Sequence, residues 1–197
     1  MITDRDREII NFIDKIGFST INHISDLFFN GNNFSYDLAR RRLKKIRDNG
    51  NYLRSVYCSE INKLIYIPIN SKKTSVKIHD IKLVDYLIKL KKLGCNIKEF
   101  EMFPKFNNVI PDMFVRFEFD GYEYYQIVEI QLRHDNVDVN RLSKEENIKC
   151  ILDRCDNTLP TLVVIQDTRY DYSNLDTPYD IVKINTDMSN IGKIFNI

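Results

Sequence analysis

"PDMFVRFEFDGYEYYQIVEIQ", residues 111–131, reads as two β-strands joined by a tight turn. Asp120-Gly121 is a dipeptide typical of a two-residue β-hairpin, because both turn positions require positive φ. The segments on either side of it are rich in aromatic and β-branched residues, which favour strands. This stretch therefore predicts an antiparallel strand pair around which the second half of the chain is organised.

The segments that flank this hairpin complete an α/β unit over residues 78–197. The sequence predicts a helix that begins near His79 and ends at Gly94, a strand after it, and a second helix over residues 140–155. Residues 161–167, "TLVVIQD", are a continuous apolar run, which is typical of a strand buried on both faces. With one more strand near the C-terminus, the order is helix, three strands, helix, two strands, which suits a mixed sheet with helices on its faces.

Carboxylates at the open end of the hairpin form a candidate catalytic site. Glu129 and Gln131 lie on one face of their strand, because side chains alternate between the two faces. Asp112 begins the neighbouring strand, and we expect a bulge or an offset in register to be needed to bring it level with Glu129. Asp112 and Glu129, with the carbonyl group of Ile130, are then candidate ligands for Mg²⁺ or Mn²⁺ in a metal-dependent endonuclease.

Gln131 departs from that chemistry. A lysine usually occupies its place in such sites because an ammonium group steadies the nucleophile and the phosphate, whereas an amide orients a water molecule and supplies no charge. Glu99 or Glu101 is a further candidate acid. The alternative is structural: Asp112 begins a strand after a proline turn, and Glu129, which lies among apolar residues, takes part in an ion pair.

Residues 1–70 predict three helices followed by two strands, which is the order of a winged helix-turn-helix domain. The predicted fold class is therefore α+β, with this domain followed by the α/β mixed-sheet domain of residues 78–197. Caps and stop signals mark each of the three helices. They are Thr3 with Asp6 and then Gly17 for the first helix, Ser19 or Thr20 for the second, and Ser35 with Asn49-Gly50 for the third.

The third helix is strongly basic and is the candidate DNA-reading element. Six Lys or Arg residues fall within the eight positions from Arg40 to Arg47, while Tyr36, Ala39, Leu43 and Ile46 are expected to share its buried face. Cations at this density favour binding to the phosphates of double-stranded DNA, although a protein partner is the alternative. The candidate DNA-binding residues are Ser35, Tyr36, Arg40, Arg41, Arg42, Lys44, Lys45, Arg47 and, between the two strands, Lys63.

Charge is distributed unevenly along the chain. The net charge is only +1, but residues 1–93 carry 18 Lys and Arg against 10 Asp and Glu, a balance of +8, and residues 94–197 carry a balance of −7. The polar segment "NSKKTS", residues 70–75, is the predicted domain boundary. The four cysteines form no C-x-x-C pair, His23, His79 and His134 lie far apart, and no apolar run spans a bilayer, so we expect a cytoplasmic protein without a zinc finger or a membrane segment.

Three stretches together resemble the replication-relaxation family of plasmid and mobile-element proteins. They are the helix segment with Arg41, Arg42, Leu43, Ile46, Gly50 and Leu53, the pattern formed by His79, Asp80 and Asp85, and Pro111-Asp112 with Gly121, Glu129-Ile130-Gln131 and the later strand of residues 162–168. The resemblance implies a winged helix joined to a domain similar to the PD-(D/E)xK nucleases. It also implies a role in replication, maintenance or transfer of a plasmid or mobile element, alongside replication or transfer proteins.

Three functions follow as expectations. The first is a protein that binds double-stranded DNA and whose nuclease-like domain is inactive. The second is a metal-dependent endonuclease that uses Asp112, Glu129 and Gln131. The third is a protein-interaction module, for example an inhibitor of a host enzyme. A homodimer would suit the first, because winged helices often read two-fold symmetric sites.

Overall fold

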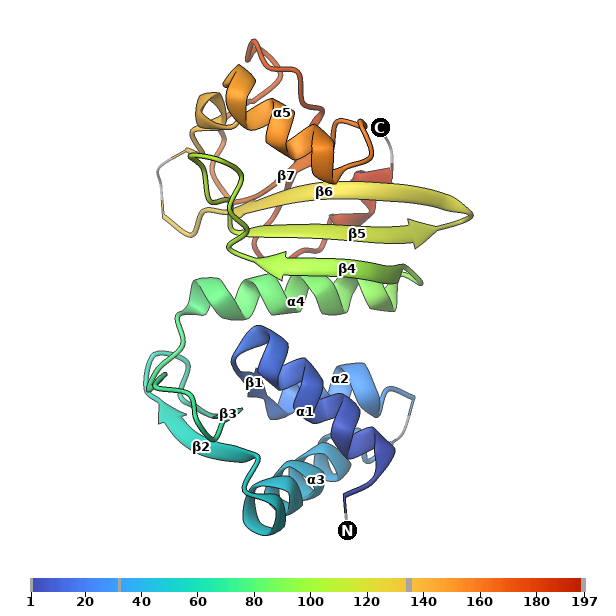
Figure 1. Cartoon of the computed structure of the whole chain (residues 1–197), viewed down its shortest axis with the longest axis vertical. Helices are drawn as coiled ribbons and strands as arrows, with labels where there is room; N and C mark the ends of the chain where they lie inside the picture. Colours follow the sequence, from blue (N-terminus) through green and yellow to red (C-terminus); the bar gives the residue numbers. More distant parts are fainter. Residues whose placement is uncertain (1, 32, 134–135, 196–197) are drawn as a thin grey trace. The chain divides into compact units, whose positions relative to one another are not determined.

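The computed structural model describes residues 2–31, 33–133 and 136–195. The chain divides into two compact units, Met1–Ile88 and Lys89–Ile197 (Figure 1), and the division falls inside the helix α4 (Ile78–Lys92). Both helices and sheets are present in the chain, as the predicted α+β class requires. None of the helices in the described part of the chain is long and apolar enough to cross a membrane.

Before α4, the first unit is formed by the helices α1, α2 and α3 and a small antiparallel sheet with the strand order β1-β3-β2. The predicted order of three helices and then a hairpin is confirmed, but the short strand β1, which pairs with β3, was not predicted. These elements are α1 (Asp4–Ile16), β1 (Ser19–Thr20), α2 (Ile21–Phe28), α3 (Ser35–Gly50), β2 (Leu53–Cys58) and β3 (Lys63–Pro68).

One apolar core joins these elements. Ile9 and Ile13 of α1, Ile24 of α2, and Leu43 of α3 are fully buried together, and further apolar residues of α3 and the sheet surround them. These positions recur at three- and four-residue spacing along α1 and α3, so each helix presents one apolar stripe to the others. The core therefore fixes which face of α3 remains exposed.

The helix ends follow the predicted caps in two of the three helices. Thr3 and Asp6 form a capping box on α1, which ends at Gly17 with φ 86°, and Thr20 caps α2 in a reciprocal pair with His23. The prediction for the third helix is wrong, because Phe34 is its N-cap residue, no side chain caps it, and Ser35 is already helical.

The end of α3 and one of its faces also differ from the prediction. The helix continues through Gly50 and ends at Asn51, whose φ of 51° is left-handed. A Cβ atom on Gly50 would lie 2.5 Å from the ring of Tyr52, so this close approach explains the glycine. Tyr36 is 50% exposed and does not lie on the buried face with Ala39 and Leu43.

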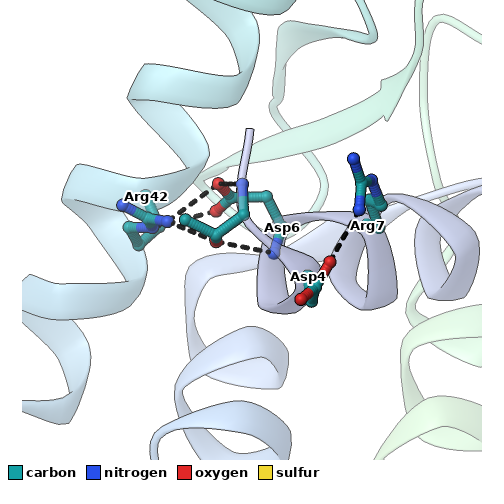
Figure 2. A network of polar contacts seen from close by, with 5 residues as sticks. Asp4, Asp6, Arg7 and Arg42 are labelled. Atoms are coloured by element: carbon teal, nitrogen blue, oxygen red, sulfur yellow. Dashed lines mark hydrogen bonds and ion pairs between the residues drawn. The ribbon is translucent and has the colours of Figure 1, made fainter. Parts of the chain in front are cut away.

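An ion pair connects the start of α1 to the middle of α3 (Figure 2). Arg42 donates from Nε to Oδ1 of Asp6 at 2.9 Å and from Nη2 to Oδ2 at 2.8 Å, and Nη2 also donates to Oγ1 of Thr3 at 2.7 Å. The N–H of Thr3 donates to Oδ2 of Asp6 at 2.8 Å, so the capping box and the ion pair share one carboxylate. Asp6 is only 1% exposed, and its charge is therefore balanced inside the unit.

These contacts set the protonation of Asp6. Burial raises the pKa of its carboxyl group, but the hydrogen bonds with Thr3 and the charge of Arg42 outweigh burial, so the pKa lies below its ordinary value of 3.8. The folded state therefore binds a proton at Asp6 less readily than the unfolded chain does.

The segment between β3 and α4 lies against the first unit. Arg54 donates from Nη2 to the carbonyl oxygens of Ser71 and Lys73, each at 2.7 Å, and Sγ of Cys58 lies 3.2 Å from the carbonyl oxygen of Val76. The predicted boundary at residues 70–75 is thus a bound segment of the first unit, and the compact units divide further along the chain.

The second unit is built on one five-stranded mixed sheet with the order β4-β5-β6-β7-β8. Strands β4, β5 and β6 are antiparallel (Figure 1), whereas β6, β7 and β8 run parallel. The predicted order of elements is confirmed. The strands are β4 (Asn96–Met102), β5 (Met113–Phe119), β6 (Tyr122–Ile130), β7 (Thr161–Ile165) and β8 (Ile181–Ile184).

The predicted hairpin turn is also confirmed, since Asp120 and Gly121 have φ values of 51° and 79°. The helix predicted over residues 140–155 begins later than expected. A short 3₁₀-helix, η1 (Val139–Arg141), precedes α5 (Glu145–Arg154), and the two are separated by a turn.

Side chains cover both faces of this sheet. On one face, apolar residues of β5, β6 and β7 pack against η1 and α5, with Phe114, Ile127 and Leu142 fully buried. On the other face, Phe195 of the 3₁₀-helix η2 (Ile191–Phe195) stacks on Phe119, with ring centroids 4.2 Å apart. The predicted central strand, β7, is buried along Leu162–Ile165 as expected.

We predict that Asp6→Asn destabilises the first unit by about 2–4 kcal/mol, because it removes the charged partner of Arg42 inside the protein. Asp4→Asn is the matched control, since Asp4 pairs with Arg7 at 2.6 Å on the surface of the same helix turn (Figure 2) and should change stability little. Denaturant unfolding of the three proteins measures the difference.

The effect of Asp6→Asn should also depend on pH. The contribution of a carboxyl group with a lowered pKa is complete well above pH 3.8 and is lost as the pH falls through its folded-state pKa. Wild type and Asp6→Asn should therefore converge in stability on acidification. A difference that stays constant down to low pH would show that Asp6 acts through packing and not through its charge.

Candidate nucleic-acid interface and carboxylate pair

The basic residues of α3 occupy different environments. Arg40, Arg41 and Lys44 are exposed, Lys45 and Arg47 are half-buried, and Arg42 is turned toward Asp6. On a helix, positions 40, 41 and 44 fall on the side opposite the apolar stripe, so their side chains form one exposed basic face. We refer to Arg40, Arg41 and Lys44 as the basic face of α3.

Neighbouring groups orient these side chains. Nε of Arg40 donates to Oδ1 of Asp37 at 3.3 Å, and Nε of Arg41 donates to the carbonyl oxygen of Asp37 at the same distance. Arg47 pairs with Asp48 at 2.7 Å and donates to Oγ of Ser55 on β2 at 3.0 Å, so it connects α3 to the sheet. Surface pairs of this kind are weak, and the guanidinium groups can exchange them for phosphates.

A hollow of about 360 Å³ lies where the first turns of α2 and α3 meet the β2–β3 hairpin. Tyr36, one helical turn before Arg40, lines it from α3, and Lys63 lines it from the hairpin. We call it the hairpin hollow. Its lining residues are Thr20, Ile21, Asn22, Tyr36, Tyr57, Asn62, Lys63 and Leu64.

The hairpin presents polar groups at this hollow. Lys63 is exposed at the start of β3, and the hydroxyl group of Tyr57 donates to Oδ1 of Asn62. Asn62 has a φ of 52°, a left-handed conformation that asparagine adopts readily in turns. The hollow therefore brings two of the predicted site residues, Tyr36 and Lys63, onto one surface of the first unit.

Such a surface can bind a nucleic acid in two ways. Cations on α3 can neutralise phosphates, and an α-helix has the width to enter the major groove of B-form DNA. Side chains in the hollow can contact sugar or base groups, because they combine aromatic rings with amide donors and acceptors. The first unit thus carries both kinds of contact on contiguous elements.

The carboxylates predicted in the second unit come together without a bulge. Met113 of β5 pairs with Val128 of β6, so the next residue out on each strand places Asp112 level with Glu129. The expectation that a bulge or an offset would be needed is wrong, because the turn at Asp120-Gly121 sets this register directly. Residues directly opposite in an antiparallel pair share a face.

Each carboxylate has a partner in the protein. Oδ2 of Asp112 accepts from the N–H of Ile130 at 2.7 Å, and Glu129, which is only 4% exposed, pairs with Nη2 of Arg141 from η1. The N–H of Gln131 donates to the carbonyl oxygen of Ile165 at 2.9 Å, which extends the pairing of β6 with β7 by one residue. The guanidinium group of Arg141 thus provides the positive charge that the buried carboxylate of Glu129 requires.

The additional acids predicted for this site have a different role. Glu99 and Glu101 both bind Nη2 of Arg154 on α5, at 2.6 and 2.8 Å, and this guanidinium group also lies 4.3 Å from the ring centroid of Phe114. Within the described ranges, no three His, Cys, Asp or Glu side chains are grouped as metal ligands. His134 lies outside the described residues.

Both candidate metal ligands are therefore engaged by groups of the protein itself. Mg²⁺ and Mn²⁺ prefer several oxygen ligands, whereas this site offers one carboxylate paired with arginine, one bound to a backbone N–H, and an uncharged Gln131. Sequence reasoning missed Arg141 and Arg154. The available signal was the apolar surroundings of Glu129, which require a charged partner but do not identify it.

Comparisons of the chain with models of protein families and with curated protein sequences gave no match. A function is therefore proposed from two features of the structure, the basic face of α3 with the hairpin hollow and the carboxylate pair of Asp112 and Glu129.

We predict that Arg141→Met destabilises the second unit by about 2–4 kcal/mol, because the buried Glu129 loses its cationic partner. Glu129→Gln in the same chain should recover much of that loss, since an amide needs no counter-charge. A double-mutant cycle by denaturant unfolding measures the coupling. Additive effects of the two substitutions would show that the pair contributes nothing and would reopen Glu129 as a ligand.

Proposed function

We propose that this protein binds double-stranded DNA through the basic face of α3 and the β2–β3 hairpin. The observation that carries the proposal is the position of Arg40, Arg41 and Lys44, which are exposed on a helix whose first turn shares the hairpin hollow with Lys63. Three helices followed by a hairpin is the order of a winged helix-turn-helix, in which the third helix enters the major groove.

Not every predicted contact is retained in this proposal. Arg42 is held by Asp6 and Thr3, so we assign it to the stability of the first unit. Arg47 is held by Asp48 and Ser55 and is placed at the edge of the interface. The proposed DNA contacts are Ser35, Tyr36, Arg40, Arg41, Lys44, Lys45 and Lys63.

The second unit is proposed to be a nuclease-like scaffold without cleavage activity. Over residues 78–197, the order of one helix, three strands, a second helix and a parallel strand, together with the level pair Asp112 and Glu129, supports a restriction-endonuclease-like fold. Arg141 neutralises Glu129, and Gln131 supplies no charge, which supports the loss of catalysis. The resemblance to the replication-relaxation family supports a role in the replication, maintenance or transfer of a plasmid or mobile element.

We predict that Arg41→Ala with Lys44→Ala weakens binding to a short duplex about tenfold or more at moderate salt. The slope of log K against log salt concentration should become shallower by about two, one for each phosphate that the variant no longer neutralises. Lys144→Ala with Lys149→Ala is the control, because it removes the same charge from exposed positions of the second unit. Fluorescence anisotropy over a salt series provides the measurement.

Equal affinities for wild type and the α3 variant would remove this helix from the interface. If wild type binds no duplex even at low salt, the protein-interaction module becomes the better explanation.

We also predict that the protein does not nick or linearise supercoiled DNA in either Mg²⁺ or Mn²⁺. The reason is that Glu129 is already paired with Arg141, and that the uncharged Gln131 occupies the place where a nuclease of this kind usually has a lysine. Agarose gel analysis of plasmid incubated with wild type and with Asp112→Ala/Glu129→Ala tests this. Cleavage by wild type that the double variant lacks would establish the endonuclease instead.

A further inference from the structure

We infer that the hairpin hollow binds one unpaired nucleotide, so that the protein prefers DNA with an unpaired base over a continuous duplex. This inference rests on the proposed function, because it assigns a substrate preference to the same DNA-binding unit. Four features of the hollow carry it: its size, its exposed rings, its amide groups and its position beside cations.

The size of the hollow suits a single nucleotide. Its volume is about 360 Å³, which lies near the lower end of the range for pockets that hold small molecules, roughly 300–1,000 Å³. A duplex backbone lies along a protein surface and fills no such hollow, whereas an unstacked base enters a pocket and is read on its faces and edges.

Two aromatic side chains from different elements are exposed there. Tyr36 at the start of α3 is 50% exposed, and Tyr57 of β2 is 60% exposed. Every base has a π-face, so tyrosine rings stack on unpaired bases with little sequence preference. In a continuous duplex those faces are already stacked on neighbouring base pairs. The two rings therefore suit an unpaired base better than a paired one.

Hydrogen-bonding groups accompany the rings. Asn62 lines the hollow, the hydroxyl group of Tyr57 donates to its Oδ1, and the same amide carries a donor at Nδ2. Asn22, from the first turn of α2, lines the hollow as a second, exposed amide. Amides can donate to and accept from a base edge at the same time, so these residues suit a base whose pairing edge is free.

Cations lie at and beside the hollow. Lys63 lines the hollow itself, and Arg40 follows Tyr36 by one helical turn on the same side of α3. The backbone on one side of an unpaired base can therefore continue along the basic face of α3. This continuity distinguishes a nucleotide in DNA from an uncharged aromatic ligand.

The test compares two short duplexes of the same sequence, one fully paired and one with a single unpaired 2-aminopurine. Wild type should bind the second about tenfold more tightly, the order expected from one stacked base, and the 2-aminopurine fluorescence should fall on binding. Tyr57→Ala should abolish the preference between the two duplexes, whereas Tyr57→Phe, which keeps the ring, should retain it.

Tyr122→Ala is the matched control, because Tyr122 is a still more exposed tyrosine at the start of β6 in the second unit and should alter neither affinity. Equal wild-type affinities for the two duplexes would overturn the inference and leave the proposed function intact. Absence of binding to either duplex would instead overturn the proposed function, and the inference with it. A preference that survives Tyr36→Ala/Tyr57→Ala would overturn the assignment to the hollow.

Discussion

The bidentate ion pair between Arg42 and Asp6 is the interaction on which the arrangement of the first unit depends. It joins the N-cap of α1 to the middle of α3 with two hydrogen bonds of 2.8 and 2.9 Å, and Thr3 completes both the cap and the pair. Apolar packing alone fixes the distance between two helices more firmly than it fixes the rotation of one about its axis. A directional pair at one edge of the apolar stripe fixes that rotation as well.

The rotation of α3 decides which of its six basic residues are exposed to a ligand. Arg42 is held at one edge of the apolar stripe, and Arg47 is bound to Ser55 near the other edge. The side of α3 that faces away from the core carries Arg40, Arg41 and Lys44. The run of six cations therefore divides into two structural residues, a compact exposed face of three, and the half-buried Lys45 beside that face. Removing Arg42 or Arg47 should reduce the stability of the fold, whereas removing a residue of the basic face of α3 should reduce the charge that is offered to a ligand.

The sequence predicted those features that depend on a few adjacent residues, but it did not predict which residues form ion pairs across long separations in the chain. The capping box at Thr3, the stop at Gly17 and the turn at Asp120-Gly121 follow from rules about a few adjacent residues, and each was confirmed. Arg42, by contrast, binds a residue 36 positions away, and Arg154 binds Glu99 at a separation of 55, so nothing near either arginine in sequence identifies its partner. The register of β5 with β6 could have been obtained by counting outward from the predicted turn, since a two-residue hairpin fixes it. That count places Asp112 level with Glu129, and the candidate pair was therefore better determined by the sequence than we expected.

The distribution of charge bears on where DNA can bind. Residues 1–88 carry 15 basic and 10 acidic residues, whereas residues 89–197 carry 14 and 18, so the asymmetry persists when the chain is divided at its compact units. Several acids of the second unit are used internally, by Arg116 with Glu123, Arg154 with Glu99 and Arg141 with Glu129. A surface of net negative charge repels the phosphates of DNA. A bound metal ion could offset that repulsion, but the acids that are paired with arginine are already neutralised within the protein. The same ion pairs that stabilise the sheet thus support the proposal that a nucleic acid binds at the first unit, where the basic face of α3 and the hairpin hollow lie.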